Sequence, residues 1–441
     1  MKIELNGHNK KYIELYEKIV ELINNNSLKP NEKLPSKRDL SIDLNISVNT
    51  VINAYMMLLD EGYIYSIEKK GYFVTKQPIM VKKPMIYQEK KKEKNENIIY
   101  DFTTSKIEEF PSSKWIKIMK SVVLNNDYLN KSDILGDAGL RYEIKEHLRI
   151  NKGINTNIDN ILICNGIEAM ERILNLSDID ELILENPGYH KLSKININKK
   201  ISYIDIDKEG VLVPKKRCIL YTTPFSQFPT GIKMSISRKK ELINFINKTD
   251  SLIIEDDFDS EFRINGQRAS SIYSLDRDRV IFFSSFTTTM YPGIRLAYMI
   301  LPDKLLKLYN EKYEIYSSSP TLEQLMLKEF IKNGGYAAHI NKIKRLYLKK
   351  RQLILKILKD YNYIKADDKK CYLSIPLKIN TKYNDEEIIN ILKNKNIKIT
   401  MLSNYDINKK NSKTIILGYT SIPYEKIDDG LRLLAKLIKA D

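Results

Sequence analysis

The chain has 441 residues, a length that predicts two or three domains and excludes a single small domain. Its formal net charge of +17 favours a polyanionic partner such as nucleic acid, because Lys and Arg side chains near phosphates release condensed counterions. A general enrichment in Lys, Asn and Ile explains the same charge without such a partner, so the charge alone leaves both interpretations open.

The cysteines Cys164, Cys218 and Cys371 lie far apart without metal-ligand spacing, which indicates buried thiols in a reducing cytosol. The first residues, MKIELNGHNKKY, lack the apolar centre of a signal peptide. No run approaches the roughly 20 apolar residues of a membrane helix. These features predict a cytoplasmic protein with no membrane partner and no metal.

Residues 36–62 carry the pattern of two helices joined by a tight turn. Ser36 and Asp39 form a predicted capping box at the start of the first helix. Asn45 and Ile46 form the turn, and Ser47 is positioned to cap the second helix. Helical spacing predicts that this second helix packs through Val48, Val51, Tyr55, Leu58 and Leu59.

The other side of the second helix is polar, as expected of a helix that enters the major groove of DNA. In a helix-turn-helix the second helix presents residues to base edges, while the first helix contacts the backbone. Basic side chains suit phosphates, and amide or hydroxyl side chains suit bases. The candidate contact residues of the two helices are Lys37, Arg38, Ser47, Asn49, Thr50 and Asn53.

A basic hairpin follows the second helix. Gly62 ends that helix, and YIYSI followed by EKKGYFV predicts two strands whose tip holds Lys69, Lys70 and Gly71. An ordinary packed helix pair is the alternative for two capped helices alone. The full order of elements over residues 10–75 resembles the winged helix of GntR-type regulators. Their pattern usually has Arg where this chain has Asn49, which affects the operator sequence and not the fold.

The remaining chain predicts a linker and an α/β body. The stretch KQPIMVKKPMIYQEKKKEKNENI combines prolines and charge with little periodicity and predicts a linker over residues 76–99, after a first domain at 1–75. Apolar runs such as NILIC, ELILE and RVIFFSS alternate with helical segments, which predicts a mostly parallel sheet covered by helices over 100–320. Strands near CYLSIPL and TIILGYT predict a small C-terminal α/β domain over 321–441.

Six segments of this body carry a second resemblance: FPSSKWIKI, GLRYEIKEHL, ENPGYHKL, TTPFSQFPTG, IIEDDFDSEFR and SSFTTTMYPGIRLAY. Together with the winged helix, they resemble the MocR-type subgroup of GntR regulators over nearly the whole chain. The resemblance implies a winged helix fused to a fold type I aminotransferase-like domain. It also implies pyridoxal phosphate (PLP) as the cofactor of that domain.

PLP chemistry needs a lysine amine, a carboxylate on the pyridinium nitrogen, and cationic and hydroxyl groups around the phosphate. The resemblance implies that Asp256 binds the pyridinium, Tyr189 covers the ring, and Ser285 and Arg295 bind the phosphate. Without a ligand, Asp256 could end a strand in a solvent-facing acidic cluster and Tyr189 could pack structurally. Arg295 could then pair with a nearby carboxylate: Asp256, Asp257 or Glu168.

Other positions depart from the family pattern. Thr288 stands in place of the lysine that forms an imine with PLP, and threonine cannot form an imine. Phe258 replaces a tyrosine that binds the cofactor's phenolic oxygen. Ile167 and Glu168 follow Gly166 where the phosphate-binding turn normally has hydroxyl and amide residues. These changes argue against covalent PLP and leave weak noncovalent binding open.

The resulting prediction is a transcription regulator that binds double-stranded operator DNA through its winged helix. Its aminotransferase-like body forms a homodimer, head-to-tail by resemblance, and senses a small molecule such as PLP, a vitamer or an amino acid. One alternative is a PLP-dependent aminotransferase or PLP-sensing regulator that binds the cofactor weakly or noncovalently. The other is a rigid dimer scaffold without a ligand.

Overall fold

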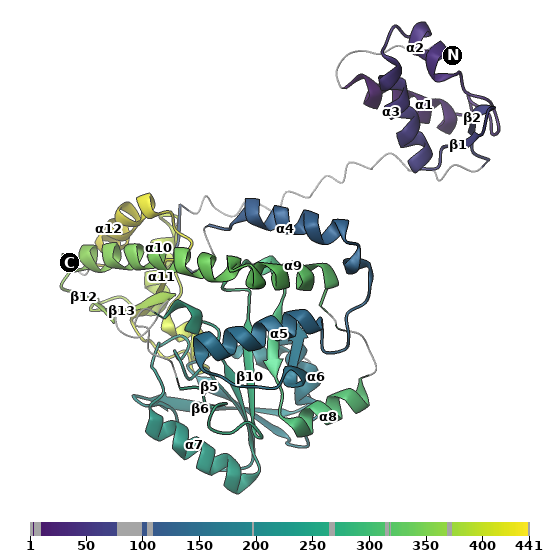
Figure 1. Cartoon of the computed structure of the whole chain (residues 1–441). Coiled ribbons are helices and arrows are strands. Elements are labelled where there is room, and N and C mark those ends of the chain that lie inside the picture. The colour runs from purple at the N-terminus through teal and green to yellow at the C-terminus, as the bar shows by residue number, and fades with distance from the viewer. Residues whose placement is uncertain are drawn as a thin grey trace. The chain divides into compact units, whose positions relative to one another are not determined.

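The computed structural model describes residues 3, 10–76, 99–103, 109–195, 198–263, 270–313, 317, 319–367 and 373–439 (Figure 1). The chain divides into two compact units, Met1–Lys94 and Asn95–Asp441. Residues 77–98 of the predicted linker and Cys371 lie outside the described residues. Within the described ranges, no helix is both long and apolar enough to cross a membrane.

The first unit is a winged helix, as predicted. It contains α1 (Lys11–Asn24), α2 (Lys37–Asp43), α3 (Val48–Asp60) and an antiparallel hairpin of β1 (Ile64–Ile67) and β2 (Gly71–Val74). One apolar core joins α1 to α3, because each helix presents apolar residues at helical spacing. The fully buried side chains of this core include Leu15, Ile19, Val51, Tyr55 and Leu58.

Local signals fix the ends of the two helices. Ser36 Oγ accepts a hydrogen bond from the Asp39 amide at 3.2 Å, and Ser47 Oγ accepts one from the Thr50 amide at 3.1 Å. Asn45 in the turn between them has a φ of +49°, a conformation that asparagine tolerates. The prediction for Val48 is wrong: this side chain is 39% exposed, because the buried face of α3 begins one turn later.

An eight-stranded sheet forms the centre of the second unit, in the order β4-β11-β10-β9-β8-β5-β6-β7. Strands β10, β9, β8, β5 and β6 run parallel, whereas β11 and β7 are antiparallel to their neighbours. The predicted mostly parallel sheet is confirmed. The strands are β4 (Ile161–Cys164), β5 (Glu181–Asn186), β6 (Lys200–Asp207), β7 (Gly210–Val211), β8 (Ile219–Thr222), β9 (Leu252–Asp256), β10 (Val280–Ser285) and β11 (Ala297–Ile300).

Helices cover both faces of this sheet, which gives an α/β fold of three layers. One face packs against α5 (Ala138–His147) and α7 (Ile236–Thr249), with α4 (Ser112–Leu124) and α9 (Thr321–Lys332) also in this core. The other face packs against α6 (Met170–Leu174) and α8 (Asp303–Lys312). Two cores form because successive residues of a strand point to opposite faces. Cys164 and Cys218 are buried free thiols, as predicted.

The C-terminal part carries a second, antiparallel sheet of β12 (Ile364–Ala366), β13 (Ser374–Ile379) and β15 (Thr414–Gly418). Around it are the long helix α10 (Gly335–Leu358), α11 (Asp385–Lys393) and α12 (Ile427–Ile438). The short strand β14 (Ile397–Lys398) pairs with β3 (Tyr100–Asp101), so the beginning of the body is tied to its C-terminal part. The boundary at residue 320 stays a prediction.

Candidate functional site

The start of α2 and the tip of the wing line one groove in the first unit. The ammonium of Lys37 lies 5.0 Å from the centre of the Tyr72 ring, and the Leu34 amide donates a 2.9 Å hydrogen bond to the Tyr72 carbonyl. These contacts fix α2 against the wing. The predicted DNA-contacting residues that the groove brings together are Lys37, Arg38, Lys69, Lys70 and Gly71.

The other predicted DNA-contacting residues lie at the beginning of α3 and do not line this groove. Asn49 and Asn53 are exposed. Thr50 is half-buried, and its hydroxyl lies 2.8 Å from the Ser47 hydroxyl within the helix cap. The amides of Asn49 and Asn53 are therefore better placed for base contacts than the two capping hydroxyls.

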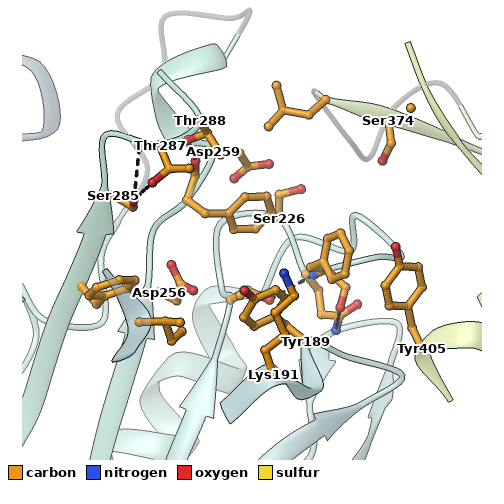
Figure 2. A pocket seen from close by; sticks show the side chains of 18 of the residues that line it. Tyr189, Lys191, Ser226, Asp256, Asp259, Ser285, Thr287, Thr288, Ser374 and Tyr405 are labelled. Atoms are coloured by element: carbon orange, nitrogen blue, oxygen red, sulfur yellow. Dashed lines mark hydrogen bonds between the residues drawn. The ribbon is translucent and has the colours of Figure 1, made fainter. Parts of the chain in front are cut away.

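A cavity of about 400 Å³ lies in the second unit, at the carboxyl ends of several strands of the large sheet (Figure 2). This edge of an open α/β sheet is where such folds bind ligands. Figure 2 shows Ser285, Thr287 and Thr288 grouped together, with Tyr405 entering from the C-terminal part of the chain. The cavity is lined by the predicted pocket residues Tyr189, Asp256, Phe258, Ser285, Thr288 and Arg295.

Asp256 is buried at the end of β9 and does not belong to a solvent-facing cluster, which corrects that alternative. Tyr221 on the neighbouring strand donates a hydrogen bond to its Oδ2. Its Oδ1 has no hydrogen-bond partner in the described part of the chain. Burial raises the pKa of Asp256 to about 7. One oxygen of this carboxyl group thus accepts a hydrogen bond, and the other is buried without a described partner.

The neighbouring Asp257 is also buried, and it belongs to an ion cluster that sequence analysis missed. Lys152 Nζ lies 2.5 Å from Asp257 Oδ2 and 3.0 Å from Glu261 Oε1, and His147 Nε2 lies 2.9 Å from the same Glu261 oxygen. No local signal separates Lys152 from the many solvated lysines of the chain. This cluster holds the segment directly after Asp256 through residues that do not line the cavity.

The loop after β10 satisfies its own hydroxyl groups. Thr288 Oγ1 donates a 2.9 Å hydrogen bond to the Phe258 carbonyl. Ser285 Oγ donates to Thr287 Oγ1 at 2.8 Å and accepts from the Thr287 amide at 3.1 Å. The residue at the expected lysine position therefore bonds to the main chain, and the expected phosphate-binding hydroxyl bonds within its own loop.

Arg295 forms an ion pair with Glu168, as one structural alternative anticipated. Both side chains are about half exposed, at 49% and 56%. They lie against Gly166: a Cβ atom at that residue would come within 3.2 Å of each of them. Gly166 also has a φ of +113°, which favours glycine. The turn that would bind a phosphate thus contains an internal ion pair.

Aromatic side chains form one wall of the cavity. Phe228 makes edge contacts with Tyr189, Phe258 and Tyr405, at ring-centre distances of 6.2, 6.0 and 4.8 Å. Lys191 also lines the cavity, with its ammonium 5.6 Å from the centre of the Tyr189 ring. Sequence analysis quoted the segment TTPFSQFPTG, which contains Phe228, without assigning that residue a role. It missed Tyr405, because nothing in the sequence indicates that the segment around residue 405 reaches this edge.

Comparison with known proteins identifies both units. Residues 11–74 match the family model of bacterial regulatory proteins of the gntR family. The chain is 31% identical to the uncharacterized HTH-type transcriptional regulator YdeL of Bacillus subtilis, across 96% of each chain. The chain belongs to the GntR family, in its MocR-like subgroup. It is also 25% identical to the probable rhizopine catabolism regulatory protein MocR of Rhizobium meliloti, across 96% of this chain and 92% of that protein.

Solved structures show the fold of the body of this MocR-like protein. A multiple substrate aminotransferase from Thermococcus profundus superimposes with a TM-score of 0.69 at 22% identity, across 82% of this chain and 96% of that one. A kynurenine aminotransferase from Pyrococcus horikoshii superimposes with a TM-score of 0.68 at 21% identity, across 78% of this chain and 91% of that one. The predicted aminotransferase-like fold is confirmed.

This fold family implies PLP, and the cavity fits only part of that cofactor. The free oxygen of Asp256 and the aromatic wall suit a nitrogen-containing ring. The phosphate and imine positions do not fit: Arg295 is paired with Glu168, Ser285 is bonded within its loop, and Thr288 has no amine. The described residues hold no group of three or more His, Cys, Asp or Glu that could bind a metal ion.

Proposed function

We propose that this MocR-like protein is a transcription regulator that acts in the cytoplasm, where its winged helix binds double-stranded operator DNA. The observation that carries this proposal is the groove between α2 and the wing. It gathers the basic side chains Lys37, Arg38, Lys69 and Lys70 within one small domain. Basic groups so arranged suit the phosphates of a duplex, and the exposed Asn49 and Asn53 on α3 suit base edges.

We also propose that the second unit forms a homodimer in a head-to-tail arrangement. Helix α4 supports this part of the proposal, because it exposes apolar residues on successive turns. These residues are Ile116, Met119, Val123 and Leu124. Exposed apolar surface of this kind typically marks an interface. Two winged helices in one dimer would bind paired half-sites on DNA.

The experiment begins with the full-length protein and a library of random duplexes, from which bound sequences are selected and enriched. A fluorescence anisotropy titration then compares the enriched duplex with a scrambled one. We expect the enriched site to bind at least about a thousandfold more tightly, as specific sites usually do. Failure to enrich any sequence, together with equal affinity for both duplexes, would contradict a regulator of this type.

The cavity retains Asp256, Tyr189 and the nearby amine of Lys191, and these residues favour one alternative function. In this alternative the body binds PLP weakly or noncovalently and acts as an aminotransferase or PLP sensor. Mixing the protein with PLP, reducing with borohydride and mapping peptides by mass would detect any imine. We expect no labelled lysine, and a stoichiometric label on Lys191 would favour the alternative.

A further inference from the structure

Two buried carboxyl groups face the cavity, each with an unpartnered oxygen. Asp256 and Asp259 are 7% and 2% exposed, and both line the cavity. The Oδ1 atoms of both have no hydrogen-bond partner in the part of the chain that the structure describes. A buried acceptor without a donor is costly, so a ligand that brings N–H donors to this end gains the missing bonds.

A charged donor suits Asp256 best. Hydrogen bonds between a cationic N–H and a carboxylate are shorter and stronger than neutral ones. Asp259 differs, because burial raises its pKa well above the usual range and favours its neutral form. The two groups together therefore offer one site for a cation and one neutral hydrogen-bonding group.

The donors that a phosphate would need are already used within the protein. Among the described lining residues the only guanidinium is that of Arg295, and it is already paired with the carboxylate of Glu168. A phosphate could use Arg295 only by displacing Glu168 and leaving its negative charge beside the new anion, and like charges so close repel. Ser285 offers no free hydroxyl proton, because that proton is donated to Thr287.

The remaining lining is suited to a ring. Tyr189, Phe228 and Phe258 line the same cavity as Asp256 and form a connected set of rings, and aromatic side chains favour stacked or edge contacts with a planar ligand. Lys191 is the one further cation among the lining residues that the structure describes, and it is exposed beside Tyr189. It does not pair with the buried carboxyl groups within the described contacts, so their oxygens remain for the ligand.

We propose that the effector of this cavity is a phosphate-free aromatic molecule with a cationic N–H group, held noncovalently with that group on Asp256 and its ring against the aromatic wall. This inference rests on the proposed role of the protein as an effector-binding regulator. It departs from the phosphate-bearing cofactor that the fold family implies. Two residues set this ligand preference. Asp256 binds the cationic group, and Glu168 disfavours a phosphate.

A matched pair of probes tests this ligand class. Pyridoxamine and pyridoxamine 5′-phosphate share a ring and an amine and differ only in the phosphate. Isothermal titration of the full-length protein should show pyridoxamine binding at least about tenfold more tightly than its phosphate. Glu168→Gln frees Arg295 and should reduce or reverse this preference. Asp256→Asn should weaken binding of both probes by about tenfold or more.

Other results overturn the inference. Tighter binding of pyridoxamine 5′-phosphate by the unaltered protein contradicts the role of Glu168. Binding of neither probe at millimolar concentration contradicts the ligand class. A DNA titration of the same samples separates this failure from failure of the proposed function, because a protein that selects an operator but binds neither probe remains a regulator. Circular dichroism of each variant confirms that a lost signal is not lost folding.

Discussion

The hydroxyl of Tyr221 donates a hydrogen bond to one oxygen of Asp256, a residue that lines the cavity, and the other oxygen has no partner among the described residues. The two residues lie on adjacent parallel strands, β8 and β9. Packing therefore fixes the position of the carboxyl group, but only one of its two oxygens accepts a hydrogen bond. A ligand-binding protein commonly retains such a group at the expense of stability.

Asp256→Asn should stabilise the protein at pH 8 by about 1–3 kcal/mol, because an amide removes a buried charge. Burial, together with the charges of Asp257 and Glu185, raises the pKa of Asp256 to about 7, and the hydrogen bond from Tyr221 opposes the rise. The folded state thus binds more protons than the unfolded state between about pH 4 and 7, so stability falls as pH rises through this window. Urea unfolding at pH 5 and pH 8 should show this fall in the unaltered protein and a smaller one in the variant. An equal fall in both would contradict the assignment.

Arg38→Ala should weaken DNA binding and flatten its salt dependence. One lost phosphate contact changes the slope of log affinity against log salt by about 0.9. Anisotropy titrations at several salt concentrations measure this slope. Lys216→Ala, at an exposed lysine of the second unit, is the matched control and should leave the slope unchanged. An unchanged slope for Arg38→Ala would remove this residue from the interface.

Asn49→Ala should reduce discrimination between operator and scrambled DNA by about 1–3 kcal/mol, the usual value of a bidentate base contact. Nonspecific affinity should stay the same, because an amide contact to a base carries no phosphate attraction. Competition titrations with the two duplexes measure both quantities. A uniform loss of affinity on both would assign Asn49 to the backbone instead.

Thr288→Lys alone should give little reducible PLP adduct, because Glu168 still pairs with Arg295, the residue expected to bind the phosphate. The double variant Thr288→Lys/Glu168→Gln supplies the amine and also frees Arg295. We expect a borohydride-stable label on residue 288 only in this double variant, detected by absorbance and peptide mass. Equal labelling of both variants would show that Glu168 does not control phosphate binding.

Lys152→Met should destabilise the protein by about 3–5 kcal/mol, because it leaves Asp257 and Glu261 buried without their cation. Adding Asp257→Asn to that variant should recover part of the loss, since one of the two uncompensated charges is then removed. Thermal or urea unfolding measures both changes. A loss below about 1 kcal/mol, the size expected of an exposed ion pair, would show that the cluster is solvated.

The winged helix was predictable because its signals are local. The caps at Ser36 and Ser47 and the helix end at Gly62 each act within a few residues and mark the elements that the structure contains. Val48 shows the limit of helical spacing, which places it with the core residues, whereas the buried residues of α3 begin at Val51. Sequence periodicity does not predict which turns of a helix pack against a neighbour, because that depends on the tertiary structure.

The positions of cavity residues could be predicted from the fold where those residues end strands. Asp256 and Ser285 close two strands of a parallel sheet, so their placement at one edge follows from the fold. Tyr405 reaches the cavity, and Lys152 reaches the ion cluster of Asp257, from segments more distant in sequence. Their residue types carry no signal of these roles. The sequence suggested that Arg295 pairs with a carboxylate, but it could not show that Glu168 is the partner, because several carboxylates were candidates.

The hydrogen bonds of the loop after β10 have a consequence for any substitution there. Thr288 donates to the Phe258 carbonyl, Thr289 donates to the Phe286 carbonyl, and Ser285 donates to the Thr287 hydroxyl. A mutation that introduces a lysine at position 288 would remove the first of these bonds. The new amine would therefore cost the loop part of its own stabilisation, whatever that amine then binds.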